Sequence, residues 1–280
     1  MLLNLQSDII YGPVHSRRLG LSLGVNILPA HIKVCTFDCL YCQYGRCTAV
    51  PPGKTGAHNF PAVVKVLSAL EQALKKQAQP PAYITFSGNG EPTLHPDFKK
   101  MVEGVRQVRD AFCPAARTAI LSNSTTVNNP VTRQALAMLD VRIMKLDAGT
   151  EDMFRHYNRP ARSITLADTV KGLASLGNIS LQSLFTAGPE GNFTPEHLCR
   201  WVEQVKKISP LVVQIYTLAR RSPTSTITAP GRDGLMHIHR LQEKENIPAA
   251  VFAQQPKPFS CKGPAWLDRG TWPGLCQNNV

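Results

Sequence analysis

Three cysteines within one short segment are the side chains of this chain best suited to chemistry. Cys35, Cys39 and Cys42 lie in CTFDCLYCQYGRC, residues 35–47, with the spacing C-x-x-x-C-x-x-C. Three thiolates in one loop could bind zinc with a fourth ligand such as His31, because structural zinc sites have four ligands. They could also hold a four-iron four-sulfur cluster, whose fourth iron would then lack a protein ligand. The spacing therefore predicts a metal centre, and in the cluster case one position open to a small molecule.

The composition limits the setting and the partner. The 280 residues carry 31 Lys and Arg against 19 Asp and Glu, a net charge of +12 that favours an acidic partner. No apolar run approaches the roughly 20 residues of a membrane span. The first residues lack the order of a signal peptide. We therefore expect a cytoplasmic protein with no membrane partner, in which clustered cysteines bind metal or do chemistry rather than form disulfides.

Apolar strand-like runs alternate with helical patterns along most of the chain. This alternation predicts parallel strands joined by right-handed helical crossovers. The number of units is too small for a full eightfold barrel, so we expect an α/β fold, a partial (β/α)6 TIM-like barrel with an irregular C-terminal tail. The six main strand-like runs are residues 21–28, 82–88, 118–124, 141–149, 178–187 and 211–220.

Three regions are expected from this pattern: an N-terminal extension at 1–20, the barrel at 21–253 and a tail at 254–280. The tail is rich in Gly, Pro and Trp and contains Cys261 and Cys276. With Cys47, these two cysteines could form part of a second iron–sulfur site. The simpler interpretation is two free thiols in a segment that packs over the barrel.

Polar segments follow the predicted strands at the points where they end. The cysteine loop follows the first strand, SGNGEPT the second, SNST the third and KLDAG the fourth, while QSLF lies in the fifth and YTLARR ends the sixth. In barrels of this class the functional residues lie at the carboxyl ends of the strands. The sequence therefore predicts one polar mouth with the cysteines at its rim.

Two of these segments resemble the radical S-adenosylmethionine (radical SAM) superfamily. The cysteine spacing, with the aromatic Tyr41 before the last cysteine, is that of the family, and SGNGEPTLHP at 87–96 resembles its Gly-Gly-Glu segment. The resemblance implies that Cys35, Cys39 and Cys42 hold a 4Fe-4S cluster. It also implies that S-adenosylmethionine (SAM) chelates the open iron and is cleaved to a 5′-deoxyadenosyl radical that abstracts hydrogen from a substrate.

The resemblance also implies which residues contact SAM. Glu91 is expected at its amino group, Lys145 at its carboxylate and Asp147 at a ribose hydroxyl, although an ordinary ion pair is an alternative for the last two. Glycines would let the backbone approach the cofactor closely. The catalytic residue is not predicted, and Gln182 is as well explained as a core-rim residue. The full set expected at the cofactor is Tyr41, Gly88, Gly90, Glu91, Ser122, Asn123, Lys145, Asp147 and Ser183.

Further segments over residues 11–222 narrow the resemblance to one branch. YGPVHSRRLGLSLGVNILP, NRPA and QIYTLARRSP resemble proteins grouped with the wyosine-synthase-like tRNA enzymes, a branch that includes the spliceases of ribosomally made peptides. Spliceases excise a tyramine unit from the peptide backbone and leave an α-keto-β-amino acid. True wyosine synthases carry extra cysteines before the triplet, whereas here none precedes Cys35.

We therefore expect an acidic, ribosomally made precursor peptide as the substrate, lying near Arg220. A small companion protein that presents the leader is an expected partner, as is an external electron donor such as flavodoxin or ferredoxin. Two alternatives stay open: a tRNA-modifying radical SAM enzyme, and a non-catalytic zinc protein that binds RNA. The signatures of common RNA-binding modules are absent from the sequence.

Overall fold

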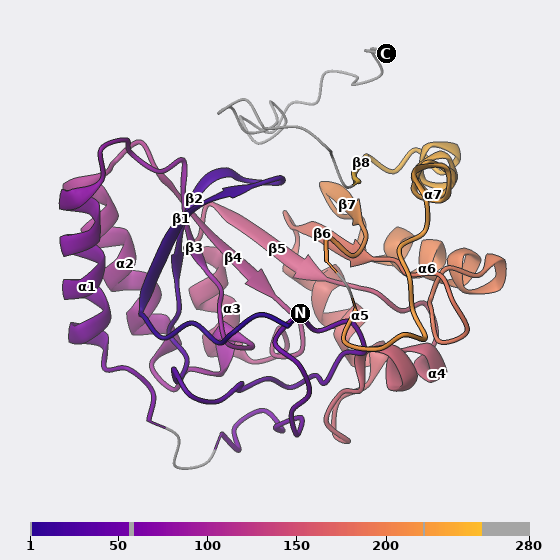
Figure 1. Ribbon diagram of the computed structural model, residues 1–280, viewed down its shortest axis with the longest axis horizontal. Helices are drawn as coiled ribbons and strands as arrows, with labels where there is room; N and C mark the ends of the chain where they lie inside the picture. The colour runs from indigo at the N-terminus through magenta and orange to yellow at the C-terminus, as the bar shows by residue number, and fades with distance from the viewer. Residues whose placement is uncertain (1, 56–58, 221, 254–280) are drawn as a thin grey trace.

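A computed structural model describes residues 2–55, 59–220 and 222–253. Strands and helices alternate through most of this range (Figure 1). In chain order the elements are β1 (Ile10–Ser16), β2 (Gly20–Val25), α1 (Val63–Lys76), β3 (Tyr83–Phe86), the 3-10 turn η1 (Pro92–Leu94), α2 (Phe98–Phe112), β4 (Arg117–Ser122), α3 (Pro130–Ala137), β5 (Val141–Lys145), α4 (Glu151–Met153), the π-helical turn η2 (Phe154–Asn158), α5 (Leu166–Leu176), β6 (Ser180–Leu184), α6 (Pro195–Ile208), β7 (Val212–Tyr216), α7 (Arg232–Lys244) and β8 (Ala249–Phe252).

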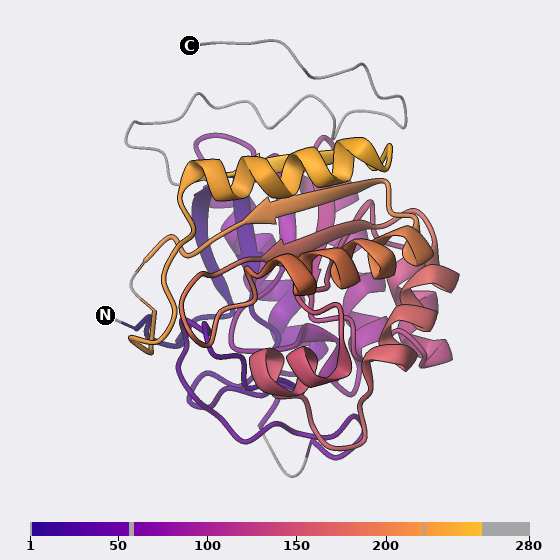
Figure 2. The same cartoon turned by 90° about the vertical axis from the view of Figure 1, so that its right-hand side faces the viewer.

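The eight strands form one sheet in the order in which they occur in the chain. β1 pairs antiparallel with β2, and every later neighbour is parallel. The helices lie on one side of the curled sheet, and Figure 2 shows α6 and α7 side by side in front of the last strands. The predicted α/β fold and open partial barrel are confirmed. The predicted tail at 254–280 lies outside the described residues.

The local sequence explains why the crossover helices form where they do. In α1, the buried Val66, Leu70 and Leu74 recur every four residues and so face the sheet together. The side chains of Thr165 and Thr194 accept hydrogen bonds from backbone N–H groups at the starts of α5 and α6, the role for which threonine is favoured at a helix start. These helices bring each strand back parallel to the one before, so that the carboxyl ends of the strands meet at one edge.

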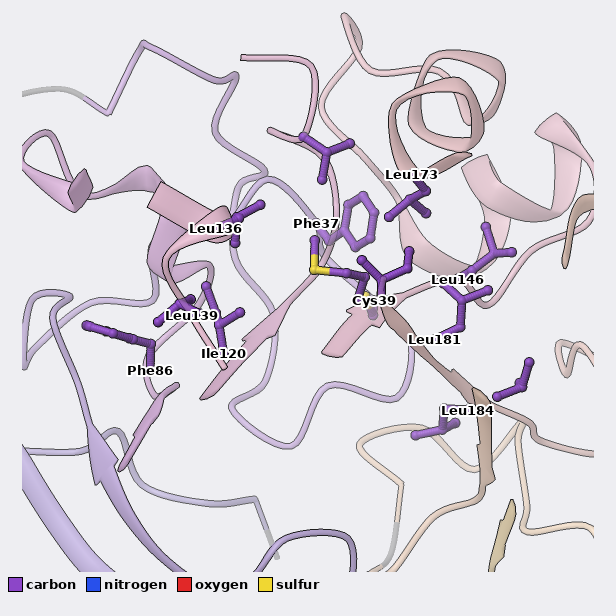
Figure 3. Packing of buried hydrophobic residues seen from close by; sticks show 14 of the residues in the cluster. Phe37, Cys39, Phe86, Ile120, Leu136, Leu139, Leu146, Leu173, Leu181 and Leu184 are labelled. Atoms are coloured by element: carbon purple, nitrogen blue, oxygen red, sulfur yellow. The ribbon is translucent and has the colours of Figure 1, made fainter. Parts of the chain in front are cut away.

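Apolar side chains form two layers, one on each face of the sheet. The larger layer lies between sheet and helices, and the cysteine loop contributes to it: Cys39 and Phe37 pack in the same cluster as Ile120 and Leu181 (Figure 3). The smaller layer lies on the concave face. It holds Leu19 against side chains of β3, β4 and β5, which are Tyr83, Ala119, Val141 and Ile143.

The turn between β1 and β2 joins the two edges of the open sheet. Arg17 in this turn donates a hydrogen bond from Nη1 to the carbonyl of Ala253, 3.0 Å away and just beyond β8. The sequence does not predict a strand at β1, because four of its seven residues are exposed and Pro13 lacks a backbone N–H group. Such a strand is typical of a sheet edge and has no apolar run by which the sequence would indicate it.

Candidate functional site

A cavity of about 400 Å³ lies on the concave side of the sheet, among the segments that follow the strands. It is the place where most of the predicted site residues meet. The residues of that set that line it are Cys35, Cys39, Cys42, Tyr41, Gly88, Gly90, Glu91, Ser122, Asn123, Lys145, Gln182 and Arg220.

The cysteine loop is held in place by backbone hydrogen bonds at both ends. The N–H of Cys42 donates to the carbonyl of Cys39, and the N–H of Val50 donates to the carbonyl of Cys35. Lys33, which precedes the loop and is 7% exposed, donates from Nζ to the carbonyl of Gly45 at 2.6 Å and contacts Cys42 Sγ at 3.3 Å. The loop thus presents its three thiols to one cavity with a buried ammonium beside them.

The chemistry of these thiols fits an electropositive centre. Burial, and then the negative charge of Asp147, raises the pKa of Cys39 to about 12. Burial likewise raises the pKa of Cys35 well above its usual value. Burial alone would lower the pKa of Lys33, but the neighbouring sulfur of Cys42, followed by those of Cys47 and Cys35, raises it overall. Thiols in such surroundings become thiolates when a cation lies between them, as iron does in an iron–sulfur cluster. The donor set therefore suits a cluster.

The glycine segment after β3 is pressed against the cysteine loop. Gly90 has a φ of +141°, and a Cβ there would lie 1.9 Å from the carbonyl oxygen of Val34. Gly88 has a φ of +134°, and a Cβ there would lie 2.5 Å from Asn26 Oδ1. Only glycine fits these backbone angles and contacts. Glycine is therefore required at both positions because two segments of the protein itself lie in contact there.

Glu91 forms a fixed carboxylate in the cavity wall. It is 1% exposed. Its Oε1 accepts from the Thr93 hydroxyl at 2.7 Å and the Ser122 hydroxyl at 3.0 Å, and its Oε2 accepts from the Asn123 N–H at 2.5 Å. Burial raises the pKa of Glu91, and these hydrogen bonds oppose that rise. The carboxylate is thus oriented before any ligand arrives, and its position suits an amino group.

A second group centred on Asp147 lies behind the cavity wall. Its Oδ2 accepts hydrogen bonds from the Tyr41 hydroxyl and from Asn158 Nδ2, and its Oδ1 accepts from the Leu184 N–H at 2.8 Å. Lys145 Nζ stands 3.2 Å from Oδ1. Burial lowers the pKa of Lys145, but the Asp147 carboxylate raises it above its usual value. Lys145 is therefore a cation at neutral pH.

Not every predicted residue faces the cavity. Asp147 and Ser183 are buried and do not line it, and the Ser183 hydroxyl donates to the carbonyl of Leu146. Cys47 lies outside the cavity, where its thiol contacts the carbonyl of Phe37 at 3.4 Å. His31 is exposed and also lies outside it. The other members of the suggested second cluster, Cys261 and Cys276, lie outside the described residues.

The structure adds residues that the sequence analysis did not assign to the site. Lys33, Arg17, Arg18 and Tyr216 all line the cavity. The paired arginines are visible in the sequence as a local concentration of charge, and Tyr216 as the aromatic residue that ends a strand-like run. Nothing in the sequence indicates that they face the cysteines.

Two negative findings apply to the described part of the chain. No three His, Cys, Asp or Glu side chains in it stand close enough to bind a single metal ion. A four-iron cluster binds each thiolate through a different iron, so its thiols stand further apart than the ligands of one ion. None of the helices described is both long enough and apolar enough to cross a bilayer.

Comparison with known proteins gives a family match and two informative relatives. The model of the radical SAM superfamily matches residues 30–201. The protein named GTPase Obg of Brachyspira hyodysenteriae is 32% identical over 223 residues, which are 78% of this chain but 31% of that protein. A UPF0026 protein of Helicobacter pylori is 29% identical over 265 residues, 90% of this chain and 80% of that protein. The chain thus spans less than a third of the first relative.

Three solved structures share the fold at low sequence identity. Streptococcus suis SuiB bound to S-adenosylmethionine aligns with a TM-score of 0.59 and 12% identity, over 83% of this chain and 50% of that one. TYW1 with a lysine-pyruvate adduct aligns with a TM-score of 0.56 and 13% identity, over 80% of this chain and 73% of that one. The protein anSMEcpe with bound AdoMet and a peptide aligns with a TM-score of 0.55 and 14% identity, over 81% of this chain and 63% of that one.

Proposed function

We propose that this chain, which belongs to the radical SAM superfamily, binds a 4Fe-4S cluster through Cys35, Cys39 and Cys42 and cleaves SAM reductively. One observation carries the proposal: the three cysteines and the Gly90–Glu91 segment line the same cavity at the ends of the strands. When bound, the cluster supplies the electron that cleaves SAM and starts hydrogen abstraction from the substrate. The chain supplies the thiolates and the groups that orient SAM.

Each wall of the cavity has a role in this proposal. The preset Glu91 carboxylate would accept hydrogen bonds from the SAM amino group, and Gly88 and Gly90 line the cavity beside it. Lys145, held as a cation by Asp147, faces the SAM carboxylate. Ser122 and Asn123 orient Glu91 from β4. Asp147 acts by holding Tyr41 and Lys145, because its oxygens already have partners within the chain.

For the substrate, we propose a ribosomally made precursor peptide, with splicease-like excision of tyramine as the reaction. The resemblance to the splicease branch supports this choice. A structure that shares the fold was solved with AdoMet and a peptide bound. We further propose an acidic leader, a small companion protein that presents it, and an external electron donor of the flavodoxin or ferredoxin type.

The alternative is a tRNA substrate. The net charge of +12 suits a phosphate backbone as well as it suits an acidic leader. The two substrates differ in their dependence on salt, because phosphate contacts weaken steeply as salt rises, whereas a leader also binds through apolar anchors.

The cluster and SAM cleavage are tested together. Protein purified and reconstituted without oxygen should contain about four iron atoms per chain and should form 5′-deoxyadenosine from SAM when reduced. Cys39→Ala should lose that product and most of its iron. Cys199→Ala is the matched control, because Cys199 is exposed on α6, away from the cavity. Normal 5′-deoxyadenosine from Cys39→Ala would refute the cluster assignment.

The substrate is tested by mass spectrometry after turnover with SAM and reductant. A candidate precursor peptide should lose the amino group, the α-carbon and the side chain of one tyrosine, while the carbonyl of that tyrosine stays in the backbone. Unchanged peptides, together with a modified nucleoside in bulk tRNA, would replace the peptide proposal with the tRNA alternative.

A further inference from the structure

Three arginines from two distant parts of the chain converge on the cavity. Arg17 and Arg18 come from the β1–β2 turn and Arg220 from the loop after β7, and all three line the cavity. Within the described residues, no carboxylate forms an ion pair with any of them. The cavity therefore has one wall with three positive charges that the described chain does not neutralise.

Arg18 is already fixed in an orientation that suits a ligand. Its guanidinium stacks on the Tyr216 ring at 4.5 Å from the centroid, and Nη1 donates to Gln182 Oε1 at 2.8 Å. Lys145 holds Tyr216 in turn through a 2.7 Å hydrogen bond to its hydroxyl. The other N–H groups of the Arg18 guanidinium have no hydrogen-bond partner in the described structure. A stacked guanidinium with free donors matches the two oxygens of a carboxylate or phosphate.

The arrangement is electrostatically unfavourable without an anion. Burial lowers the pKa of Arg17, and the positive charges of Arg18 and Arg220 lower it further. Like charges at a partly dehydrated wall repel one another more strongly than they do in water. An anion that binds between them would remove this repulsion.

The carboxylates of the site differ from the arginines, because the side chains of Glu91 in the cavity wall and Asp147 behind it accept hydrogen bonds from the protein itself. In the proposed function, Glu91 and Lys145 receive SAM. The arginine wall is left for the other ligand, the substrate.

We propose that Arg17, Arg18 and Arg220 form a binding site for a carboxylate group of the substrate, next to the position where hydrogen is removed. The proposal rests on the proposed function for the role of that carboxylate. The volume of about 400 Å³ favours a carboxylate over a nucleotide phosphate. A nucleotide would bring a base and a sugar into space that SAM already needs, whereas a single acidic residue or a chain terminus is compact.

Calorimetric titration of the reconstituted, SAM-bound protein with small anions tests the site. We expect glutarate to bind and its neutral diamide not to bind. Arg18→Gln and Arg220→Gln should each weaken glutarate binding by about tenfold, as for a lost charge-assisted hydrogen bond. Arg200→Gln is the matched control with the same loss of charge, on the exposed face of α6 and paired with Glu203. Because Arg220 is exposed, its variant should fold even if Arg18→Gln does not.

Several results would overturn the proposal. One is glutarate that fails to bind at millimolar concentration, or that binds all the variants equally. Another is a loss of SAM affinity in Arg18→Gln as large as the loss of glutarate affinity, which would mean that the arginines bind SAM and not the substrate. Inorganic phosphate that binds more tightly than glutarate would point to nucleic acid instead.

Failure of the proposed function gives a different pattern. If the wild-type protein does not cleave SAM but still binds glutarate through the arginines, the anion site stands and the radical chemistry is wrong.

Discussion

The two walls of the cavity hold their charges in opposite ways. On the wall built by β3, β4 and β5, the carboxylates of Glu91 and Asp147 are buried and accept hydrogen bonds from neighbouring donors. On the wall built by the β1–β2 turn and the segment after β7, the arginines keep free donors. A charge that the protein satisfies by itself is part of the scaffold, and removing it should lower the free energy of unfolding. A charge that the protein leaves unsatisfied should matter for binding and little for stability.

The largest effect should follow from removing Asp147. Asp147→Ala leaves Lys145 as a buried cation without its carboxylate and removes acceptors from Tyr41 and Asn158. We expect a loss of about 3–5 kcal/mol in the free energy of unfolding, measured in urea. Asp97→Ala is the control, because its ion pair with Lys100 is exposed and screened by solvent, so the free energy of unfolding should hardly change. Equal losses in the two variants would contradict the scaffold role.

The next effect should come from the close contact between the glycine segment and the cysteine loop. Gly90→Ala places a methyl group against the Val34 carbonyl and should destabilise the fold by about 3 kcal/mol. Gly53→Ala is matched to it, because Gly53 also has a positive φ, of +76°, but has nothing within 4 Å of its Cβ position. There we expect a loss of about 1 kcal/mol from the backbone alone. Thermal unfolding of the two variants should separate steric contact from backbone strain.

A smaller effect should appear as a dependence on pH. His197 is 4% exposed, its Nε2 lies 3.1 Å from the Asp147 carbonyl, and its Nδ1 has no hydrogen-bond partner. Burial lowers the pKa of His197 below 6.5, its value in the unfolded chain. Its contribution is therefore complete above pH 6.5 and decreases as pH falls toward the folded-state pKa, by up to about 1.4 kcal/mol per pH unit.

Urea unfolding of His197→Gln between pH 7 and 5 should show a shallower loss of stability than the wild-type protein. His156→Gln, which changes a half-exposed histidine, should follow the wild-type slope. An unchanged slope in His197→Gln would mean that the buried ring accepts its proton without difficulty.

The smallest effect should come from the arginine wall. Arg18→Gln loses the stacking on Tyr216 and the hydrogen bond to Gln182 but relieves repulsion from Arg17, so the free energy of unfolding should change by no more than about 1 kcal/mol. The measurement is the same urea titration. A loss above about 2 kcal/mol would make Arg18 a structural residue and remove the contrast between the two walls.

The sequence predicts the parts of this molecule that depend on local pattern. The repeat of strand and helix indicates the half-barrel, and the cysteine spacing with SGNGEPT indicates the segments that meet in the cavity. The ends of α5 and α6 follow from Thr165, Gly177 and Thr194. Each of these features depends on neighbours within a few residues, which is why periodicity and turn chemistry report them.

The features that the sequence does not predict are contacts between residues that lie far apart in the chain. Arg17 contacts a carbonyl 236 residues away, and Arg18 contacts Gln182 across 164 residues. No local pattern specifies either pair. Asp147 is similar: its position after a strand predicts a residue at the mouth, but Tyr41 and Asn158 supply donors from behind the wall and hold its carboxylate there.

Leu19 makes the two ends of the concave face different. Its side chain packs on β3, β4 and β5 between Tyr83 and Val141 and occupies the interior where the parallel strands begin. The interior is therefore filled at the end where the strands begin, and its open space lies at the end where the strands finish, beside the cysteines. A ligand therefore reaches the cysteines from the carboxyl ends of the strands.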